Sequence, residues 1–141
     1  MLRNGLHHGR PSHAHPIMTN RRDIPPDAAF ETWTAPDGWP VRLFRRDAPA
    51  GAGRGSLLFQ GGRGDIVEKY LEAFDHWHGQ GWSVQAFDWR GQGGSGRLGR
   101  DPKVGHCVDF AVWVDDLAAF FDQWRATTPG PHVVIAHSMG G

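Results

Sequence analysis

The spacing of hydrophobic residues predicts strands at five places along the chain. Positions 30–34 alternate and are rich in aromatic and β-branched residues. Positions 41–45 form a second such run after the turn signal Pro36-Asp37-Gly38, so the two runs predict an antiparallel hairpin. Three further short apolar runs predict buried strands, at positions 56–60, 82–87 and 132–136.

Two longer stretches change to a period of 3.6 residues, which predicts amphipathic helices. The apolar face of the first helix consists of Val67, Tyr70, Leu71, Phe74, Trp77 and His78. Asp65 and Glu68 stand three residues apart at its start and predict a capping box with Asp65 as the cap. The second helix ends before Pro129, and its apolar face consists of Phe110, Trp113, Val114, Leu117, Phe121 and Trp124. Strands that alternate with helices predict an α/β fold with a mostly parallel sheet.

Residues 1–29 have no periodic apolar pattern and are rich in His, Arg and Pro, so they are predicted to be a disordered leader. Met18 lies inside this leader and is an alternative start of the natural protein. The leader also contains four histidines that lack an ordered scaffold for metal coordination, namely His7, His8, His13 and His15. We therefore predict no metal site. Residues 30–141 are long enough for one domain with a single core.

Composition narrows the classes of partner and compartment. Lys plus Arg (15) balances Asp plus Glu (15), so nothing points to nucleic acid or to an anionic membrane surface. The single cysteine, Cys107, cannot form an internal disulfide, which fits a reducing compartment. No apolar run reaches the roughly 18 residues of a spanning helix, and no secretory signal is evident. We therefore expect a cytoplasmic protein without a transmembrane segment.

The loop that follows positions 82–87 contains a formal G-x-G-x-x-G pattern at Gly91, Gly93 and Gly96. Taken alone, this spacing is that of a dinucleotide-binding loop. Such a loop needs its first glycine at the end of the strand and a helix that begins under the pyrophosphate. Here residues 88–90 intervene, and the residues after Gly96 are poor helix starters. The pattern therefore predicts no nicotinamide or flavin cofactor.

The segment after positions 132–136 meets a stricter test. A nucleophile elbow needs a buried strand followed by a serine at a tight, strained turn, and the serine's neighbours must be small because the backbone is crowded there. Ser138 has Ala136 two residues before it and Gly140 two residues after it. Glycine is usual at the first of these positions, so Ala136 is a small departure from the pattern.

Three loops, each after a predicted strand, together resemble the α/β-hydrolase superfamily: Gln60-Gly61-Gly62-Arg63-Gly64-Asp65, Asp88-Trp89-Arg90-Gly91-Gln92-Gly93-Gly94-Ser95-Gly96-Arg97 and Ala136-His137-Ser138-Met139-Gly140-Gly141. Within it, Glu68-Lys69-Tyr70 and the run from Phe87 to Gly93 look most like the lysophospholipase and monoacylglycerol-lipase branch. The match extends from about Phe30 to Gly141. It implies the N-terminal half of an α/β-hydrolase fold that acts on a small acyl ester or lysolipid, with transient contact with lipid aggregates.

The resemblance also implies roles for individual residues. Ser138 Oγ would attack an ester carbonyl and form an acyl-enzyme. The backbone N–H of Met139, the residue after the nucleophile, is one candidate oxyanion donor. Aligning Gly61 and Gly62 with the His-Gly pair of related lipases assigns the second donor to the Arg63 N–H. Gly61 departs from the histidine of many relatives, but the main-chain donor does not depend on that side chain.

Asp88, Arg90 and Gly62 are expected to support the loops beside the elbow and to take no part in the reaction itself. Asp88 and Arg90 are expected to brace the loop beside the elbow by hydrogen bonds or an ion pair. His137 adjoins the serine, but neighbouring side chains at the end of a strand point to opposite sides, so it is expected to face away from Ser138 Oγ.

In this fold the triad follows the chain order Ser, acid, His, and only three residues follow Ser138 in the sequence. We therefore interpret the chain as a hydrolase fragment that is truncated at the elbow and inactive by itself, with the acid and the histidine outside it. Two alternatives stay open. One is a related serine hydrolase, such as an aminopeptidase or thioesterase. The other is a non-catalytic fragment or pseudo-hydrolase that acts as a binding module.

Overall fold

The computed structural model describes residues 23–101 and 109–141. Met18, the leader histidines and Cys107 lie outside these ranges. The described strands are β1 (Ala29–Thr34), β2 (Pro40–Arg46), β3 (Gly55–Gln60), β4 (Trp82–Phe87) and β5 (His132–Ala136). All five predicted strands are therefore confirmed, each to within one residue at either end.

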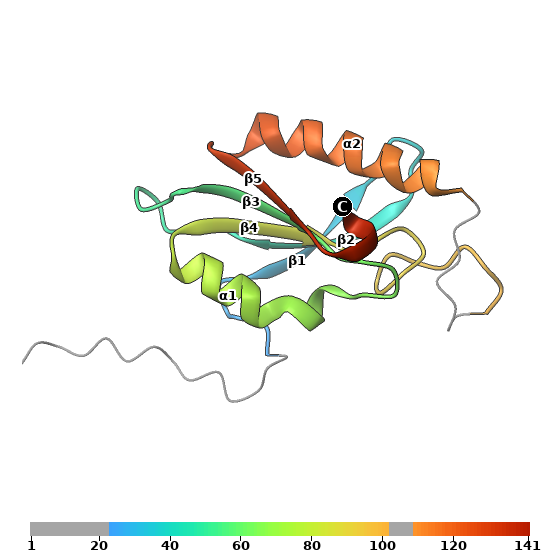
Figure 1. Ribbon diagram of the computed structural model, residues 1–141, viewed down its shortest axis with the longest axis horizontal. Coiled ribbons are helices and arrows are strands. Elements are labelled where there is room, and N and C mark those ends of the chain that lie inside the picture. Colours follow the sequence, from blue (N-terminus) through green and yellow to red (C-terminus); the bar gives the residue numbers. More distant parts are fainter. Residues whose placement is uncertain (1–22, 102–108) are drawn as a thin grey trace, which may run out of the picture.

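The five strands form one mixed sheet in the order β1-β2-β4-β3-β5 (Figure 1). β1 and β2 pair in antiparallel fashion and form the predicted hairpin, and β2 is also antiparallel to β4. β3 lies between β4 and β5 and is parallel to both. The carboxyl ends of these three parallel strands therefore meet at one edge of the sheet, where the three glycine-containing loops begin.

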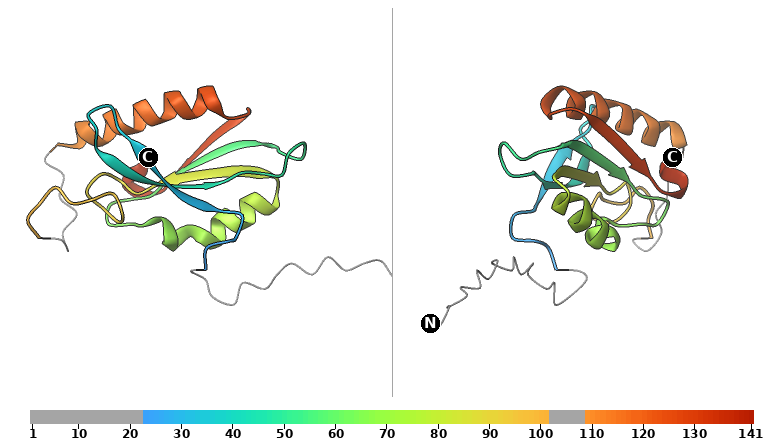
Figure 2. Two further views of the ribbon diagram at one scale, coloured as in Figure 1. Left: turned by 180° about the vertical axis from the view of Figure 1, so that it is seen from behind. Right: turned by 60° about the vertical axis from the view of Figure 1, so that its left-hand side comes forward.

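The helices cover both faces of the sheet. A 3-10 turn, η1 (Val67–Tyr70), leads into α1 (Leu71–Gly79), and α2 (Phe110–Thr127) precedes β5. A second short 3-10 turn, η2 (Ser138–Gly140), follows β5. Figures 1 and 2 show α1 on one side of the sheet and α2 on the other. Among the described residues, no helix has both the length and the hydropathy that crossing a bilayer requires.

Two hydrophobic cores fill the space between the sheet and its helices. On the α1 side, Leu57 and Phe59 of β3 pack in one cluster with Phe74. On the α2 side, Leu58 packs in a second cluster with Trp113. Successive side chains of a strand point to opposite faces, so a strand covered on both sides must be apolar throughout. This explains why β3 is buried at every position.

The structure corrects the predicted capping box. Neither η1 nor α1 has a side-chain cap. The Val67 N–H at the start of η1 instead donates to Asp88 Oδ1 at 2.9 Å. Glu68 accepts from Arg42 Nη2 at 2.5 Å, and Asp65 is used elsewhere. The prediction was wrong because a buried carboxylate from the loop after β4 takes the amide that a local cap would have used.

The orientation of α2 also differs in part from the prediction. Phe110 and Val114, which were placed on its apolar face, are 57% and 63% exposed. The buried side consists of Trp113, Asp116, Phe120 and Trp124. Asp116 is turned inward because its carboxylate pairs with Arg90 at 2.8 Å. A buried ion pair, which hydrophobic spacing does not reveal, therefore helps to set the rotation of this helix.

Candidate functional site

Ser138 lies in a strained turn directly after β5. Its φ is 55°, and it is the sole non-glycine residue with positive φ among residues 23–101 and 109–141. This left-handed conformation costs an ordinary residue about 1 kcal/mol. The turn is also crowded, because a Cβ on Gly140 would lie 2.5 Å from the Gln60 carbonyl oxygen. The backbone thus has the geometry that a nucleophile elbow requires, and the Ser138 residue is exposed.

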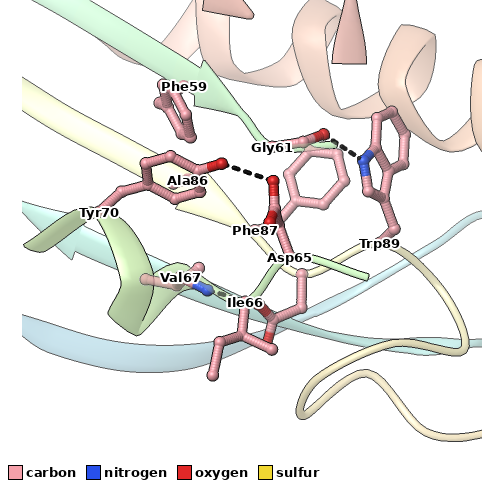
Figure 3. A pocket seen from close by; sticks show the side chains of 10 residues that line it. Phe59, Gly61, Asp65, Ile66, Val67, Tyr70, Ala86, Phe87 and Trp89 are labelled. Atoms are coloured by element: carbon pink, nitrogen blue, oxygen red, sulfur yellow. Dashed lines mark hydrogen bonds between the residues drawn. The ribbon is translucent and has the colours of Figure 1, made fainter. Parts of the chain in front are cut away.

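The loop after β3 is held by its own backbone groups. The Gly61 carbonyl accepts from Trp89 Nε1 at 2.7 Å, which is visible as a dashed line in Figure 3. The Gly62 N–H donates to Asp65 Oδ2 at 3.0 Å, and the Gly64 N–H donates to Gln92 Oε1. These bonds fix the backbone on both sides of Arg63.

This loop touches the elbow. A Cβ on Gly62 would lie 3.0 Å from Ser138 Cβ and 3.3 Å from the His137 carbonyl oxygen, so a larger residue would force the elbow to shift by a few tenths of an ångström. The structure therefore brings together Gly62 and Ser138, and with them the neighbouring residues Arg63 and Met139. Within the described part of the chain, neither the Arg63 N–H nor the Met139 N–H donates a hydrogen bond. Two unpaired amides on touching loops are what an oxyanion hole uses.

Asp88 is buried beneath the glycine-rich loop after β4. Its Oδ1 accepts from the Val67 N–H, and its Oδ2 accepts from the Gly94 N–H at 2.9 Å. Arg42 Nε lies 3.0 Å from the same Oδ2. Burial raises the pKa of the Asp88 carboxyl above its usual range. Asp88 therefore ties the start of η1 to the loop and has no contact with Ser138.

Arg90 forms ion pairs with two carboxylates that lie outside its own loop. Its guanidinium pairs with Asp116 of α2 and, at 2.5 Å, with Asp37 of the hairpin turn. The hydrogen bond from Arg90 lowers the pKa of Asp37 to about 2, whereas burial raises that of Asp116. Arg90 also accepts, through its carbonyl oxygen, a hydrogen bond from Trp113 Nε1. It therefore joins the loop to α2 and to the hairpin.

A third group beside the elbow was missed by the sequence analysis. Asp65 Oδ2 accepts from the Tyr70 hydroxyl at 2.5 Å, and Lys69 Nζ lies 2.5 Å from Oδ1 (Figure 3 shows the tyrosine bond). His137 Nδ1 lies 3.2 Å from the same hydroxyl and 3.5 Å from Asp65 Oδ2. The imidazole is therefore turned toward Asp65 and η1. We call Asp65, Tyr70 and His137 the carboxylate cluster.

The pKa values of the carboxylate cluster fit an anionic Asp65 and a neutral Tyr70. Burial alone raises the pKa of Asp65, but hydrogen bonds from Lys69, Tyr70 and Gly62 outweigh it and lower the value to about 2. Burial and the hydrogen bond to Asp65 raise the pKa of Tyr70 to about 12. At neutral pH the hydroxyl therefore keeps its proton and donates it to the carboxylate.

The glycine-rich loop after β4 is filled by its own side chains. A Cβ on Gly93 would collide with the Asp88 carboxylate. Arg97 Nη1 donates to the carbonyl oxygens of Gly93 and Gly96 at 2.9 Å and 2.6 Å. No helix follows this loop directly, since residues 97–101 are irregular. The described residues also contain no cluster of three or more His, Cys, Asp or Glu side chains that is placed to hold a metal ion.

A small pocket lies beside the loop that follows β3 (Figure 3). It has room for about one water molecule. Its lining residues are Phe59, Gly61, Asp65, Ile66, Val67, Tyr70, Ala86, Phe87, Asp88 and Trp89. The pocket is too small for an acyl chain, so it does not define a substrate.

Comparison with known proteins assigns the chain to a family. Residues 51–141 match the family described as serine aminopeptidase, S33. Lysophospholipase L2 of Escherichia coli is 49% identical over 84 residues, which are 57% of this chain and 24% of that protein. Probable lysophospholipase L2 of Haemophilus influenzae is 37% identical over 94 residues, which are 65% of this chain and 29% of that protein. The chain thus spans about a quarter of the length of these relatives.

Solved structures agree with the sequence match on the fold. An alpha/beta hydrolase from Novosphingobium aromaticivorans superposes with a TM-score of 0.61 at 20% identity, over 81% of this chain and 36% of that one. At this identity the likeness concerns the fold alone. Together with the family match over residues 51–141, it shows that the chain belongs to the serine aminopeptidase S33 family of α/β hydrolases and is similar in sequence to lysophospholipases.

Proposed function

We propose that Ser138 is the nucleophile of a serine hydrolase that cleaves the carboxylic ester of lysophospholipids. The observation that carries the proposal is the left-handed backbone of Ser138 in contact with Gly62. This contact brings the exposed serine together with the Arg63 and Met139 N–H groups, which donate to no other group in the described part of the chain. The choice of substrate rests on the two relatives, which are both named as lysophospholipases.

In the proposed reaction Ser138 Oγ attacks the ester carbonyl, and the alcohol leaves to give an acyl-enzyme that water then hydrolyses. The negative charge on the tetrahedral intermediate is stabilised by the Met139 and Arg63 N–H groups. Loss of one such donor typically slows a hydrolase by about 100- to 1,000-fold. Asp88 and Arg90 keep the adjoining loop in shape and touch no reacting atom.

The serine needs a base, because its hydroxyl is protonated and weakly nucleophilic at neutral pH. His137 is unsuited to that role, since its Nδ1 is engaged with Tyr70 and its ring is turned toward η1. In this fold the acid and the histidine follow the nucleophile in chain order. We expect both to come from outside residues 1–141, and we expect the 141-residue chain to have no turnover by itself.

A second candidate is hydrolysis of a peptide at its amino terminus, which the family description favours. The same nucleophile and oxyanion donors would serve an amide substrate. The two candidates differ in what must be bound: a free α-amino group in one and an acyl chain in the other. A non-catalytic binding module is the outcome that remains if the serine is never activated.

The test uses a chimera in which this chain replaces the matching segment of the Escherichia coli relative, which then supplies the remaining residues. We expect labelling by a fluorophosphonate and release of fatty acid from lysophosphatidylcholine, both abolished by Ser138→Ala. Release of an amino-terminal residue from a peptide amide, without fatty acid release, would favour the second candidate. A folded chimera with neither activity nor labelling would contradict the proposal, whereas the parental relative serves as the positive control.

A further inference from the structure

We propose that the carboxylate cluster is the device that sets the spacing of the two oxyanion donors, with Asp65 and Tyr70 as positioning residues. The catalytic consequence of this inference rests on the proposed function, but its structural part does not. The sequence pattern gave Asp65 a capping role and placed Tyr70 on a helix face, and neither that pattern nor the family match assigns the two residues a role in the oxyanion hole.

The first observation is where the Asp65 carboxylate sits. Its Oδ2 accepts from the Gly62 N–H at 3.0 Å, and Gly62 is the residue directly before the proposed donor Arg63. The same oxygen lies 3.5 Å from His137 Nδ1, and His137 is two residues before the other proposed donor, Met139. One oxygen atom therefore touches both of the loops that carry the amides.

The second observation is the order of protons in the carboxylate cluster. Tyr70 has a single hydroxyl proton, which it donates to Asp65 at 2.5 Å. The hydroxyl oxygen can then only accept, so His137 must present a protonated Nδ1 at 3.2 Å. The pKa values of Asp65 and Tyr70, about 2 and about 12, support this arrangement. His137 is thereby fixed in one tautomer by its neighbours.

The third observation is that the cluster rests on a rigid base. The ring of Tyr70 packs against Phe59, with ring centroids 4.5 Å apart, and against Phe74 of α1. Lys69 holds the other carboxylate oxygen, Oδ1. The hydroxyl of Tyr70 is therefore held in place by core packing, and it can transmit that position to the loop after β3 and to the elbow.

The direct test is NMR on the 141-residue chain. In the wild-type protein we expect the imidazole ¹⁵N shifts of His137 to report the Nδ1–H tautomer. Tyr70→Phe removes only the hydroxyl, and we expect it to shift the tautomer equilibrium and to move the amide signals of Gly62 and Met139. Asp65→Asn should move the same signals further. Asp75 lies on α1 and pairs with Arg46 of β2. Asp75→Asn removes this carboxylate and should leave the signals of Gly62, His137 and Met139 unchanged.

Unchanged His137 and Met139 signals in Tyr70→Phe would overturn the inference. This variant decides the matter even if Asp65→Asn fails to fold, because it retains the ring and its packing. A change confined to Tyr70 and its immediate neighbours on α1 would overturn it as well, since that is what a merely local structural role predicts.

The kinetic consequence is tested in the chimera described above. A displacement of about 1 Å near the reacting atoms typically costs a hydrolase about 100-fold. We expect Asp65→Asn to lower kcat about 100-fold and Tyr70→Phe about 10-fold, with KM changed less than about threefold, since the donors act on the transition state. A loss seen in KM alone would contradict positioning. If the chimera is inactive while the NMR signals move as expected, the proposed function fails and the structural inference stands.

Discussion

The loop after β4 and the turn after β5 leave the same edge of the sheet, but they hold their polar groups in opposite ways. In the first, which we call the Asp88 loop (residues 88–96), the Asp88 carboxylate and the Ser95 hydroxyl are fully buried and bonded to backbone groups. In the second, the elbow turn (residues 137–141), the Ser138 residue is exposed and its backbone is strained.

The difference shows where each segment gets its shape. In the Asp88 loop, the side chains of Asp88 and Ser95 hold the backbone in place, so their polar atoms are already used in hydrogen bonds. The elbow turn is closed by backbone hydrogen bonds from the Gly140 N–H to the His137 carbonyl and from the Gly141 N–H to the Ser138 carbonyl, and it is anchored to the end of β3 by the His137 N–H, which donates to the Gln60 carbonyl. Among the contacts of residues 23–101 and 109–141, neither the Ser138 hydroxyl nor the Met139 N–H forms a hydrogen bond that holds the turn. Because the Ser138 hydroxyl and the Met139 N–H are not needed to hold the turn, both groups stay available for catalysis.

The largest expected contrast comes from removing one polar side chain in each segment. Asp88→Ala leaves the Val67 and Gly94 amides and part of Arg42 without a partner, and should lower the free energy of unfolding by about 3 kcal/mol. Ser138→Ala should change it by less than about 0.5 kcal/mol. Urea unfolding measures both. Equal effects in the two variants would show that the Asp88 loop does not depend on its carboxylate.

Glycine substitutions test the backbone in each segment. Gly140→Ala brings a Cβ against the Gln60 and Gly61 carbonyls, and overpacking of this kind costs about 2 kcal/mol. Gly93→Ala combines a collision with Asp88 and a positive φ of 51°, so it should cost about 3 kcal/mol. Gly64→Ala is the matched control, since its φ is also positive but its Cβ would meet nothing within 4 Å. It should cost about 1 kcal/mol in thermal or urea unfolding.

The pH dependence of stability should have opposite signs for the two carboxyl groups. Asp65 has a folded pKa of about 2, below its unfolded value of 3.8, so its stabilisation is present above about pH 4 and is lost as the pH falls toward 2. The shift corresponds to about 2 kcal/mol. The pKa of Asp88 is raised on folding, so its contribution to stability instead falls as the pH rises through the interval above 3.8.

Urea unfolding between pH 2 and pH 6 separates these two effects. The stability difference between wild type and Asp65→Asn should shrink on acidification, whereas the difference between wild type and Asp88→Asn should shift in favour of the wild type. Parallel curves for the two variants would contradict the contrast between the two carboxyl environments.

The smallest expected effect concerns strain in the elbow turn. Ser138→Gly releases the left-handed strain of about 1 kcal/mol, part of which is offset by the greater backbone entropy of glycine in the unfolded chain. We expect a net gain in stability of about 0.5 kcal/mol. Ser138→Ala retains the strain and serves as the control in the same thermal unfolding experiment. A loss of stability in Ser138→Gly would mean that the serine is not strained there.

Local features of this chain were predictable from the sequence, and contacts between distant segments were not. The period-two and apolar runs gave the bounds of β4 and β5 to the residue, because strand formation on a covered sheet follows side-chain alternation. The strained backbone of the elbow turn could also be predicted from the sequence, since small residues around a serine indicate a crowded backbone. The capping box failed because the competing Asp88 carboxylate lies 21 residues away in sequence.

The candidate site shows the same division. Ser138, Met139 and Gly62 could be predicted as site residues because each lies in a recognisable loop that follows a strand. Tyr70 and His137 are 67 residues apart, and only the parallel pairing of β3 with β5 brings them together. No spacing rule connects them. The inward Asp116 was missed for the same reason, since its partner Arg90 belongs to another loop.

The strand order has a consequence for how this chain folds while the ribosome synthesises it. β3 lies between β4 and β5, so both of its partners are synthesised after it. β4 begins 22 residues after β3 ends, and β5 begins 72 residues after it. Ribosomes add about 5–20 residues per second, so roughly 4–14 seconds pass between the synthesis of β3 and that of β5, its second neighbour in the sheet. The most deeply buried strand therefore stays an unpaired apolar segment for part of the synthesis, and the turn that contains Ser138 is the last of the three loops after β3, β4 and β5 to form.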